Sequence, residues 1–330
     1  MTAGEPLLAV AAEHAEGGVE AWRLDGAVPR RVAAVRLPGA FTLLAHPLRP
    51  VLYAASSAHG ALLTLEVTAG GGLDARDRLP GGDSLPCSLA LDTSATRLAV
   101  AHYDAGAISL HALGPEGVPE PGEWLPVPAG TGPDPGRQDA PHPHQVRFGA
   151  SGDLWATDLG TDRLLRYPPE GGAPDVVPVA RGSGPRHFAW LADGRVAVVD
   201  ELASRLTVLT AAGAPAGSVA IGALREGRSF PSDLAVHPSR DLVYVANRGA
   251  DTVSVVDVRA RPVLVQEVAV GRWPQHLLIG PDALWCAARD DDRVLRLPLH
   301  GTGLLGDSEP VLDVVRPSWL AWAGGSPWAA

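Results

Sequence analysis

The sequence predicts an all-β fold, a seven-bladed β-propeller whose blades are four-stranded antiparallel sheets. Three observations predict it. A proline followed by an apolar run recurs seven times, the copies are spaced near 45 residues apart, and the segments between them alternate apolar and polar residues. Four short strands at this period are typical of a propeller blade. We therefore expect one β-propeller domain over residues 1–330.

Each copy of the repeat begins with a proline, two variable residues and an apolar run. The leading prolines are Pro38, Pro86, Pro143, Pro185, Pro231, Pro274 and Pro317. Successive differences between them are 48, 57, 42, 46, 43 and 43 residues. Seven copies predict seven blades.

The copy that follows Pro231 shows the strands of one blade in order. Residues 234–241 (LAVHPSRD) supply a first strand and its turn, and residues 242–247 (LVYVAN) supply a second strand. Residues 252–258 (TVSVVDV) and 264–270 (LVQEVAV) supply the third and the fourth. β-Branched residues and period-two alternation favour strands over helices in all four segments.

The two ends of the chain are expected to share one blade. Residues 7–24 (LLAVAAEHAEGGVEAWRL) match the second and third strands of a blade, whereas residues 317–322 (PSWLAW) supply only a first strand. Pairing these segments closes the ring and removes free sheet edges. Because a closed ring has no edge that needs a partner, we expect a monomer.

Composition limits the classes of function. Hydrophobic residues make up 46% and charged residues 19% of the chain, which fits a globular protein with a large core. The formal net charge is −10. Binding of nucleic acid or an anionic membrane needs a concentrated basic face, so neither partner is expected. All 27 basic residues are arginines, whose guanidinium groups suit bidentate binding of carboxylate or phosphate.

The cysteines and the first residues of the chain indicate a cytoplasmic protein. Cys87 and Cys286 fall in different copies and suggest no disulfide framework. The first residues have no basic segment of the kind that begins a signal peptide, and no apolar run is long enough to span a membrane. The run Asp290 to Asp292 lacks the remaining ligand spacing of a calcium loop, and no metal site is expected.

Propeller geometry brings two sets of residues to one mouth of the central channel. The loop leading into the first strand of a blade lies on the same face as the loop that joins the second and third strands. The pairs after the leading prolines are Gly39 and Ala40, Cys87 and Ser88, His144 and Gln145, Arg186 and His187, Ser232 and Asp233, Gln275 and His276, and Ser318 and Trp319. The matching loop positions are His14, Ser57, Tyr103, Leu159, Glu201, Arg248 and Arg289. Ionisable residues crowd the four copies that begin at Pro143, Pro185, Pro231 and Pro274, which makes that side the candidate site.

The residues predicted at this mouth include acids, bases and cations. Histidines such as His144 and His187 can exchange a proton near neutral pH. Arginines such as Arg186 and Arg248 can bind an anionic substrate or a developing oxyanion. Together with Glu201, they suggest hydrolysis or proton transfer on a small anion.

Five separated motifs carry a resemblance to a known family. They are APHPHQVRF, ATDLGTDRLLRY, GSGPRHFAW, VVDELASRLTVL and VYVANRGADTVSVV, and the likeness is clearest over about residues 131–258. In this order they resemble the motifs of the bacterial 6-phosphogluconolactonase family of propeller type, which is related to fungal carboxymuconate cyclases. The resemblance implies a hydrolase that opens the ester of a phosphorylated sugar lactone, with no metal and no organic cofactor.

The resemblance also implies roles for individual residues. Its histidines fall on His142 and His144, its arginines on Arg186 and Arg248, and its acidic residue on Glu201. The hypothesis is that His144 or Glu201 activates water while the two arginines hold the anion and the oxyanion. The other candidate substrate-binding residues are His187, Asp233, Arg137, Gln275, His276 and Arg289.

Several interpretations of these residues stay open at this point. Arg137 lies in the Gly/Pro-rich segment 130–140, which is either a lid that reaches inward or a plain surface excursion. The histidines could instead cap loop backbone, and Glu201 with Arg248 could form a purely structural ion pair. His187 fits an inter-blade histidine at least as well as a functional one.

Departures from the family pattern leave the substrate open. Asp200 stands where the family usually has Asn, Asp233 where it has Glu, and Gln275 and His276 where it has Arg-Asn. The expected substrate is 6-phosphogluconolactone. A lactonase or cycloisomerase acting on a carboxylated, muconate-type lactone is the alternative that the changed last blade favours. A non-catalytic propeller that serves as an interaction platform is the third possibility, because fold does not determine function.

Overall fold

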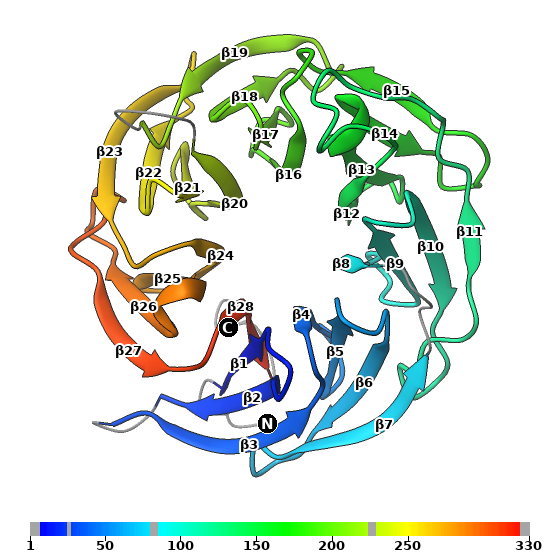
Figure 1. Ribbon diagram of the computed structural model, residues 1–330, viewed down its shortest axis with the longest axis vertical. Coiled ribbons are helices and arrows are strands. Elements are labelled where there is room, and N and C mark those ends of the chain that lie inside the picture. The colour runs from blue at the N-terminus through cyan, green and yellow to red at the C-terminus, as the bar shows by residue number, and fades with distance from the viewer. Residues whose placement is uncertain (1–6, 25–27, 80–84, 224–228, 324–330) are drawn as a thin grey trace.

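A computed structural model describes residues 7–24, 28–79, 85–223 and 229–323 of the protein. In these ranges the chain forms seven four-stranded antiparallel sheets that stand around a central axis (Figure 1). The predicted fold class, blade number and strand number are confirmed. Helical segments in the described part are two short 3₁₀ turns, Leu159–Thr161 and Arg289–Asp291, and no helix there is long and apolar enough to cross a membrane.

Each blade runs from an inner strand at the axis to an outer strand at the rim (Figure 1). The inner strands are β4 (Ala40–Ala45), β8 (Pro86–Leu91), β12 (Pro143–Phe148), β16 (Pro185–Trp190), β20 (Phe230–Val236), β24 (Pro274–Ile279) and β28 (Pro317–Ala323). The second strands are β1 (Leu7–Ala12), β5 (Val51–Ser56), β9 (Arg97–His102), β13 (Leu154–Asp158), β17 (Val196–Asp200), β21 (Leu242–Arg248) and β25 (Ala283–Ala288). The third strands are β2 (Gly18–Arg23), β6 (Leu62–Val67), β10 (Ala107–Ala112), β14 (Arg163–Tyr167), β18 (Arg205–Leu209), β22 (Thr252–Asp257) and β26 (Arg293–Pro298). The outer strands are β3 (Arg30–Arg36), β7 (Leu73–Leu79), β11 (Glu123–Leu125), β15 (Asp175–Pro178), β19 (Pro215–Ala220), β23 (Val263–Ala269) and β27 (Glu309–Asp313).

The ring closes as the sequence predicts. Strand β28 pairs antiparallel with β1, in a register that sets Leu7 opposite Ala323 and Ala12 opposite Pro317. The sheet order β28-β1-β2-β3 therefore joins the last strand to the first three, and both ends of the described chain meet in one blade (Figure 1). This pairing removes two strand edges that would otherwise be open.

The core lies between neighbouring blades. Buried Tyr244 and Val255 of one blade pack in a single cluster with Leu277 and Leu284 of the next. The outer strands bury less, since β3 and β23 alternate exposed and half-buried residues along most of their length. Packing of apolar faces across each blade boundary thus holds the ring together.

A β-bulge at the start of each inner strand sets the positions of the site residues. In β12, Pro143 lies opposite Asp158 and Gln145 opposite Thr157, so His144 is the extra residue. The same shift follows Pro86, Pro185, Pro231 and Pro274. A bulge leaves its extra residue without a partner in the ladder and aims its side chain differently from its neighbours.

The bulge corrects the prediction for Pro38. In β4 the bulge lies between Ala40 and Thr42, so Ala40 takes the place that a proline holds in the other blades. The prediction that Gly39 and Ala40 follow the leading position is wrong by two residues. Gly39 has a φ of +68°, and the turn that it makes moves the start of the strand along the chain.

Four side chains two residues after the leading position each accept a hydrogen bond from the backbone of the next blade. Gln145 Oε1 accepts a hydrogen bond from the Phe188 N–H at 2.7 Å. Asp233 Oδ2 accepts one from the Leu277 N–H at 2.8 Å. Ser88 and His276 accept from the next blade in the same way. We call Ser88, Gln145, Asp233 and His276 the belt.

Replacing Gln145 with alanine is expected to lower the free energy of unfolding by about 1–3 kcal/mol, because the buried Phe188 N–H loses its acceptor. Urea unfolding measures this. Gln266→Ala is the matched control: Gln266 also bonds backbone, at Leu305, but it is half-buried and water can replace it. Equal losses in both variants would contradict a special cost of breaking the belt.

Candidate functional site

One buried carboxylate, that of Glu201, lies at the centre of the candidate site. Arg248 Nη2 lies 2.6 Å and Arg186 Nε 2.9 Å from its Oε2, and Arg137 Nη2 lies 2.7 Å from its Oε1. Burial raises the pKa of Glu201, but the three arginines, Arg248 first, lower it to about 2. Three cations surround one anion, so the Glu201 cluster (Arg137, Arg186, Glu201 and Arg248) carries a net charge of +2.

The members of the Glu201 cluster come from separate parts of the chain. Glu201 follows β17, and its N–H donates to the Gly184 carbonyl at 2.9 Å. Arg248 ends β21, Arg186 is the bulged residue of β16, and Arg137 lies in the loop between β11 and β12. The ring of blades therefore brings together residues that are far apart in the sequence.

The three arginines differ in how far they can reach a ligand. The Arg186 side chain is 2% exposed and also donates to the Ser232 carbonyl, and burial together with the charge of Arg248 lowers its pKa to about 10. The side chains of Arg137 and Arg248 are 35% and 11% exposed. Arg137 is therefore the most accessible to a bound anion. Arg248 is less so, because its Nε also donates to the Phe230 carbonyl at 2.9 Å, and Arg186 is almost fully committed to protein groups.

The segment 130–140 is anchored so that Arg137 reaches the site. The Asp134 carbonyl accepts hydrogen bonds from the N–H groups of Arg137 at 3.1 Å and Gln138 at 2.7 Å. The buried Gln138 amide donates to the Leu159 carbonyl at 2.9 Å and to Asp162 Oδ1 at 2.8 Å. Both side chains thus point inward, which is one of the two alternatives that the sequence leaves open for this segment, and opening of the segment as a lid stays a prediction.

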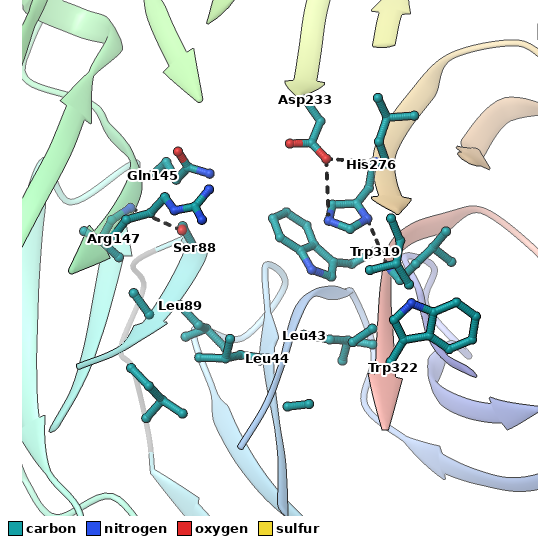
Figure 2. Close-up of a pocket in the computed structure, with 18 of the residues that line it drawn as sticks. Leu43, Leu44, Ser88, Leu89, Gln145, Arg147, Asp233, His276, Trp319 and Trp322 are labelled. Carbon is teal, nitrogen blue, oxygen red and sulfur yellow. Dashed lines mark hydrogen bonds and ion pairs between the residues drawn. The ribbon is translucent and has the colours of Figure 1, made fainter. Parts of the chain in front are cut away.

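A second group of ionisable residues lies beside the cluster. His187 Nδ1 is 2.7 Å from Asp233 Oδ1, and His276 Nε2 is 3.5 Å from Asp233 Oδ2. Figure 2 shows Asp233 beside His276 and Trp319. Burial lowers the pKa of both histidines to about 4. Burial raises the pKa of Asp233, but its contacts with the two histidines outweigh this and hold that pKa well below its usual range. At neutral pH this group is an aspartate flanked by two neutral imidazoles.

His144 differs from these histidines because its Nδ1 is buried without a hydrogen-bond partner among the described residues. Its ring faces the edges of Tyr103 and His187, at centroid distances of 5.5 and 5.3 Å. Burial, followed by the charge of Arg186, holds the pKa of His144 well below its usual value. His144 is therefore a neutral imidazole with an unused ring nitrogen.

His142 and Tyr103 form the wall next to His144. Their rings stack at a centroid distance of 4.4 Å, and His142 Nδ1 lies 2.9 Å from the Tyr103 carbonyl oxygen. Arg137 donates from Nε and Nη2 to the Tyr103 hydroxyl, both at 3.4 Å. The repeat places Tyr103 at the mouth, but it does not identify Tyr103 as a site residue, because the contact with Arg137 depends on the path of segment 130–140.

Arg289 joins the site through an aromatic ring and an acid that the sequence alignment missed. The guanidinium groups of Arg248 and Arg289 lie 5.3 and 5.2 Å from the centroid of the Trp273 ring. Arg289 Nη1 lies 3.6 Å from Glu13 Oε2. Because Ala12 lies opposite Pro317, Glu13 and not His14 takes the loop position equivalent to Arg248, which corrects the alignment. Counting residues from the position that pairs with Pro317 in the closing blade would have identified Glu13.

Ten of the eleven predicted site residues thus lie in one connected set of contacts. Gln275 is the exception: it is buried, and its Oε1 has no hydrogen-bond partner in the described ranges. Asp233 and His276 belong to this set and also to the belt. Each accepts a hydrogen bond from the backbone of the next blade, which gives both residues a structural role.

Known proteins match this chain in sequence and in fold. The family model described as a lactonase with a seven-bladed β-propeller matches residues 7–322. A 6-phosphogluconolactonase of Bacillus subtilis (strain 168) is 27% identical over 231 residues, and the match covers 63% of each chain, which is less than two thirds of that relative. The solved structure of a periplasmic gluconolactonase from Pseudomonas aeruginosa has a TM-score of 0.84 at 20% identity, covering 97% of this chain and 99% of that one. The structure of a protein from Lactobacillus plantarum has a TM-score of 0.86 at 19% identity, covering 96% of this chain and 99% of that one. At these identities, the two structures show a shared fold and no more. Because the family model spans nearly the whole described chain, this protein belongs to the lactonase family of seven-bladed β-propellers.

Proposed function

We propose that the protein is a lactonase that hydrolyses a small anionic sugar lactone, with 6-phosphogluconolactone as the first candidate substrate. The observation that carries this proposal is the Glu201 cluster, where an excess of positive charge includes the partly exposed Arg137 and the less exposed Arg248. Family membership and the name of the Bacillus subtilis relative support the same activity.

The three arginines of the Glu201 cluster have two roles in this proposal, which are binding the substrate and positioning the groups that bind it. Arg137 and Arg248 bind the anionic group and the oxyanion that develops on the lactone carbonyl, since charge-assisted donors are strongest toward such oxygens. Arg186 and Glu201 position them. Glu201 holds the three guanidinium groups together and prevents their mutual repulsion from spreading the site.

His144 is the general base in this proposal. Water attacks the lactone carbonyl carbon, its proton passes to the free Nδ1 of His144, and the ring ester C–O bond breaks as the alkoxide takes up that proton. A bound anion beside His144 stabilises the imidazolium that forms. Glu201 is the poorer base of the two suggested by the sequence, because three arginines stabilise its ionised form.

A carboxylated lactone is the second candidate substrate, and one feature of the last blades favours it. The family pattern has Arg-Asn where this chain has Gln275 and His276. His276 Nδ1 accepts from the Leu320 N–H, and its Nε2 faces Asp233. Neither residue supplies a cation in place of the missing arginine, which a dianionic phosphate would need more than a carboxylate does.

The test compares freshly prepared 6-phosphogluconolactone with uncharged gluconolactone and a muconolactone, above the spontaneous rates. We expect kcat/KM for 6-phosphogluconolactone to exceed that for gluconolactone by about tenfold or more, as one charge-assisted hydrogen bond provides. His144→Gln should lower kcat with little change in KM. Arg259→Met, on the exposed β22–β23 turn, is the control and should match the wild type.

Each outcome of this comparison decides one point. No rate above background with any of the three lactones contradicts lactonase activity. Equal rates with and without phosphate contradict anion binding by Arg137 and Arg248. A rate confined to the muconolactone replaces the phosphorylated substrate with the carboxylated one. An unchanged kcat in His144→Gln contradicts the role of His144 as the general base.

A further inference from the structure

The central channel holds a cavity beyond the belt, on the side away from the Glu201 cluster. Its volume is about 560 Å³, and residues of the inner strands line it. The belt residues Ser88, Gln145, Asp233 and His276 border its inner end, and residues near the carboxyl ends of the inner strands, such as Trp322, border its outer part (Figure 2). The Glu201 cluster and His144 are absent from this lining, whereas Asp233 and His276 of the belt belong to it, so the belt lies between the cavity and the Glu201 cluster.

Arg147 is a charged residue at a position of the repeat that is apolar in the other blades. It lies opposite Trp155 in the third register position after the bulge of β12. The equivalent residues in the other blades are Leu44, Ala90, Ala189, Ala235, Leu278 and Ala321. All six are apolar, so propeller packing does not require a charge at this position.

The Arg147 guanidinium has no direct ion-pair partner among the described residues, and several of its donors have no acceptor. Its side chain is accessible inside the channel and labelled there in Figure 2. Nη1 donates to the Phe188 carbonyl at 3.3 Å, and the guanidinium lies 5.9 Å from the centroid of the Trp190 ring. No ion pair joins it to an acid of the described residues. Burial lowers the pKa of Arg147 and the charge of nearby Asp233 raises it, while the Asp233 oxygens contact His187 and the Leu277 N–H. An arginine stays charged at any physiological pH, so the remaining donors are free for an anion.

Beyond the polar belt residues, much of the cavity wall is apolar and includes two indole rings. Leu43, Leu44, Leu89, Trp319 and Trp322 surround the open part of the cavity (Figure 2). Sites of this size with largely apolar walls and a few polar groups suit small organic ligands. A polyhydroxylated sugar acid would leave its hydroxyl groups unpaired against such walls.

We propose that this cavity is a second ligand site, for a small carboxylate with an aromatic body. The carboxylate pairs with the Arg147 guanidinium, and the ring lies against Trp322 and the leucines. The site is independent of the lactonase reaction, because the belt separates it from the Glu201 cluster.

Calorimetric titration with 1-naphthaleneacetate tests the proposal, with the uncharged 1-naphthaleneacetamide as the matched probe. We expect the acid to bind the wild type at least tenfold more tightly than the amide. Arg147→Leu, which installs the residue found in β4 and β24, should weaken acid binding at least tenfold and leave amide binding unchanged. Arg259→Leu, on an exposed turn at the same end of the propeller, should bind as the wild type does.

Two further variants locate the ligand. Ala90→Phe fills part of the cavity and should weaken both probes, while Arg248→Met should leave both unchanged. No binding of the acid to the wild type at millimolar concentration overturns the proposal. Acid binding that survives Arg147→Leu also overturns it, and so does binding lost in Arg248→Met alone, which would place the probe at the Glu201 cluster.

Discussion

Replacing Arg248 with methionine is expected to lower kcat/KM for an anionic lactone by about 10²–10³-fold, the usual cost of one missing donor to a developing oxyanion. Methionine keeps an unbranched apolar side chain, but it removes the guanidinium that lies 5.3 Å from the centroid of the Trp273 ring and 2.6 Å from Glu201. Steady-state kinetics on the folded variant measures the loss. Arg248→Lys should recover only part of the activity, because a point charge replaces a planar two-donor group.

The same variants distinguish catalysis from a structural ion pair between Arg248 and Glu201. If the pair serves only the fold, Arg248→Met lowers the free energy of unfolding while kcat/KM per folded molecule stays at the wild-type value. Arg259→Met provides the baseline, since its guanidinium pairs with Asp257 at the exposed surface. Unchanged kcat/KM in Arg248→Met would remove this residue from the substrate-binding set.

Replacing Asp200 with asparagine is expected to stabilise the protein at alkaline pH. Burial raises the pKa of Asp200 to about 7, while the Thr207 hydroxyl donates to its Oδ2 and its Oδ1 has no partner in the described part of the chain. The raised pKa means that the folded state holds this proton more tightly than the unfolded state. The stability from this group is complete below about pH 4 and is lost as pH rises through about 7.

Asparagine cannot ionise, so Asp200→Asn should exceed the wild type in unfolding free energy above pH 7, by about 4 kcal/mol at most. Near pH 4 the variant should be no more stable than the wild type. Urea unfolding from pH 4 to pH 9 measures both curves, and Asp175→Asn, at an exposed position on β15, is the matched control. Parallel curves for Asp200→Asn and wild type would show that Asp200 does not hold a proton in the fold. The asparagine that the family usually has at this position is consistent with the expected gain.

Local pattern was sufficient for the architecture. Period-two alternation, turn residues and the proline-led repeat are properties of short segments, and seven of them in a closed ring leave few other arrangements. The same repeat placed His144, Arg186, Glu201 and Arg248 at one mouth, because equivalent positions of successive blades must lie at equivalent heights along the axis. The shared blade of the two chain ends followed from counting strands.

The tertiary structure alone decided which side chains touch. The bulge in β4 moved the leading position from Pro38 to Ala40, and the register of β28 against β1 put Glu13 where His14 was expected. The path of segment 130–140 brought Arg137 onto Glu201. Contacts across blades depend on a residue or two of register and on the course of loops, and one-dimensional spacing does not specify either. The repeat could show that Arg147 breaks the apolar pattern, but the open cavity around its guanidinium exists only once seven blades have closed around the axis.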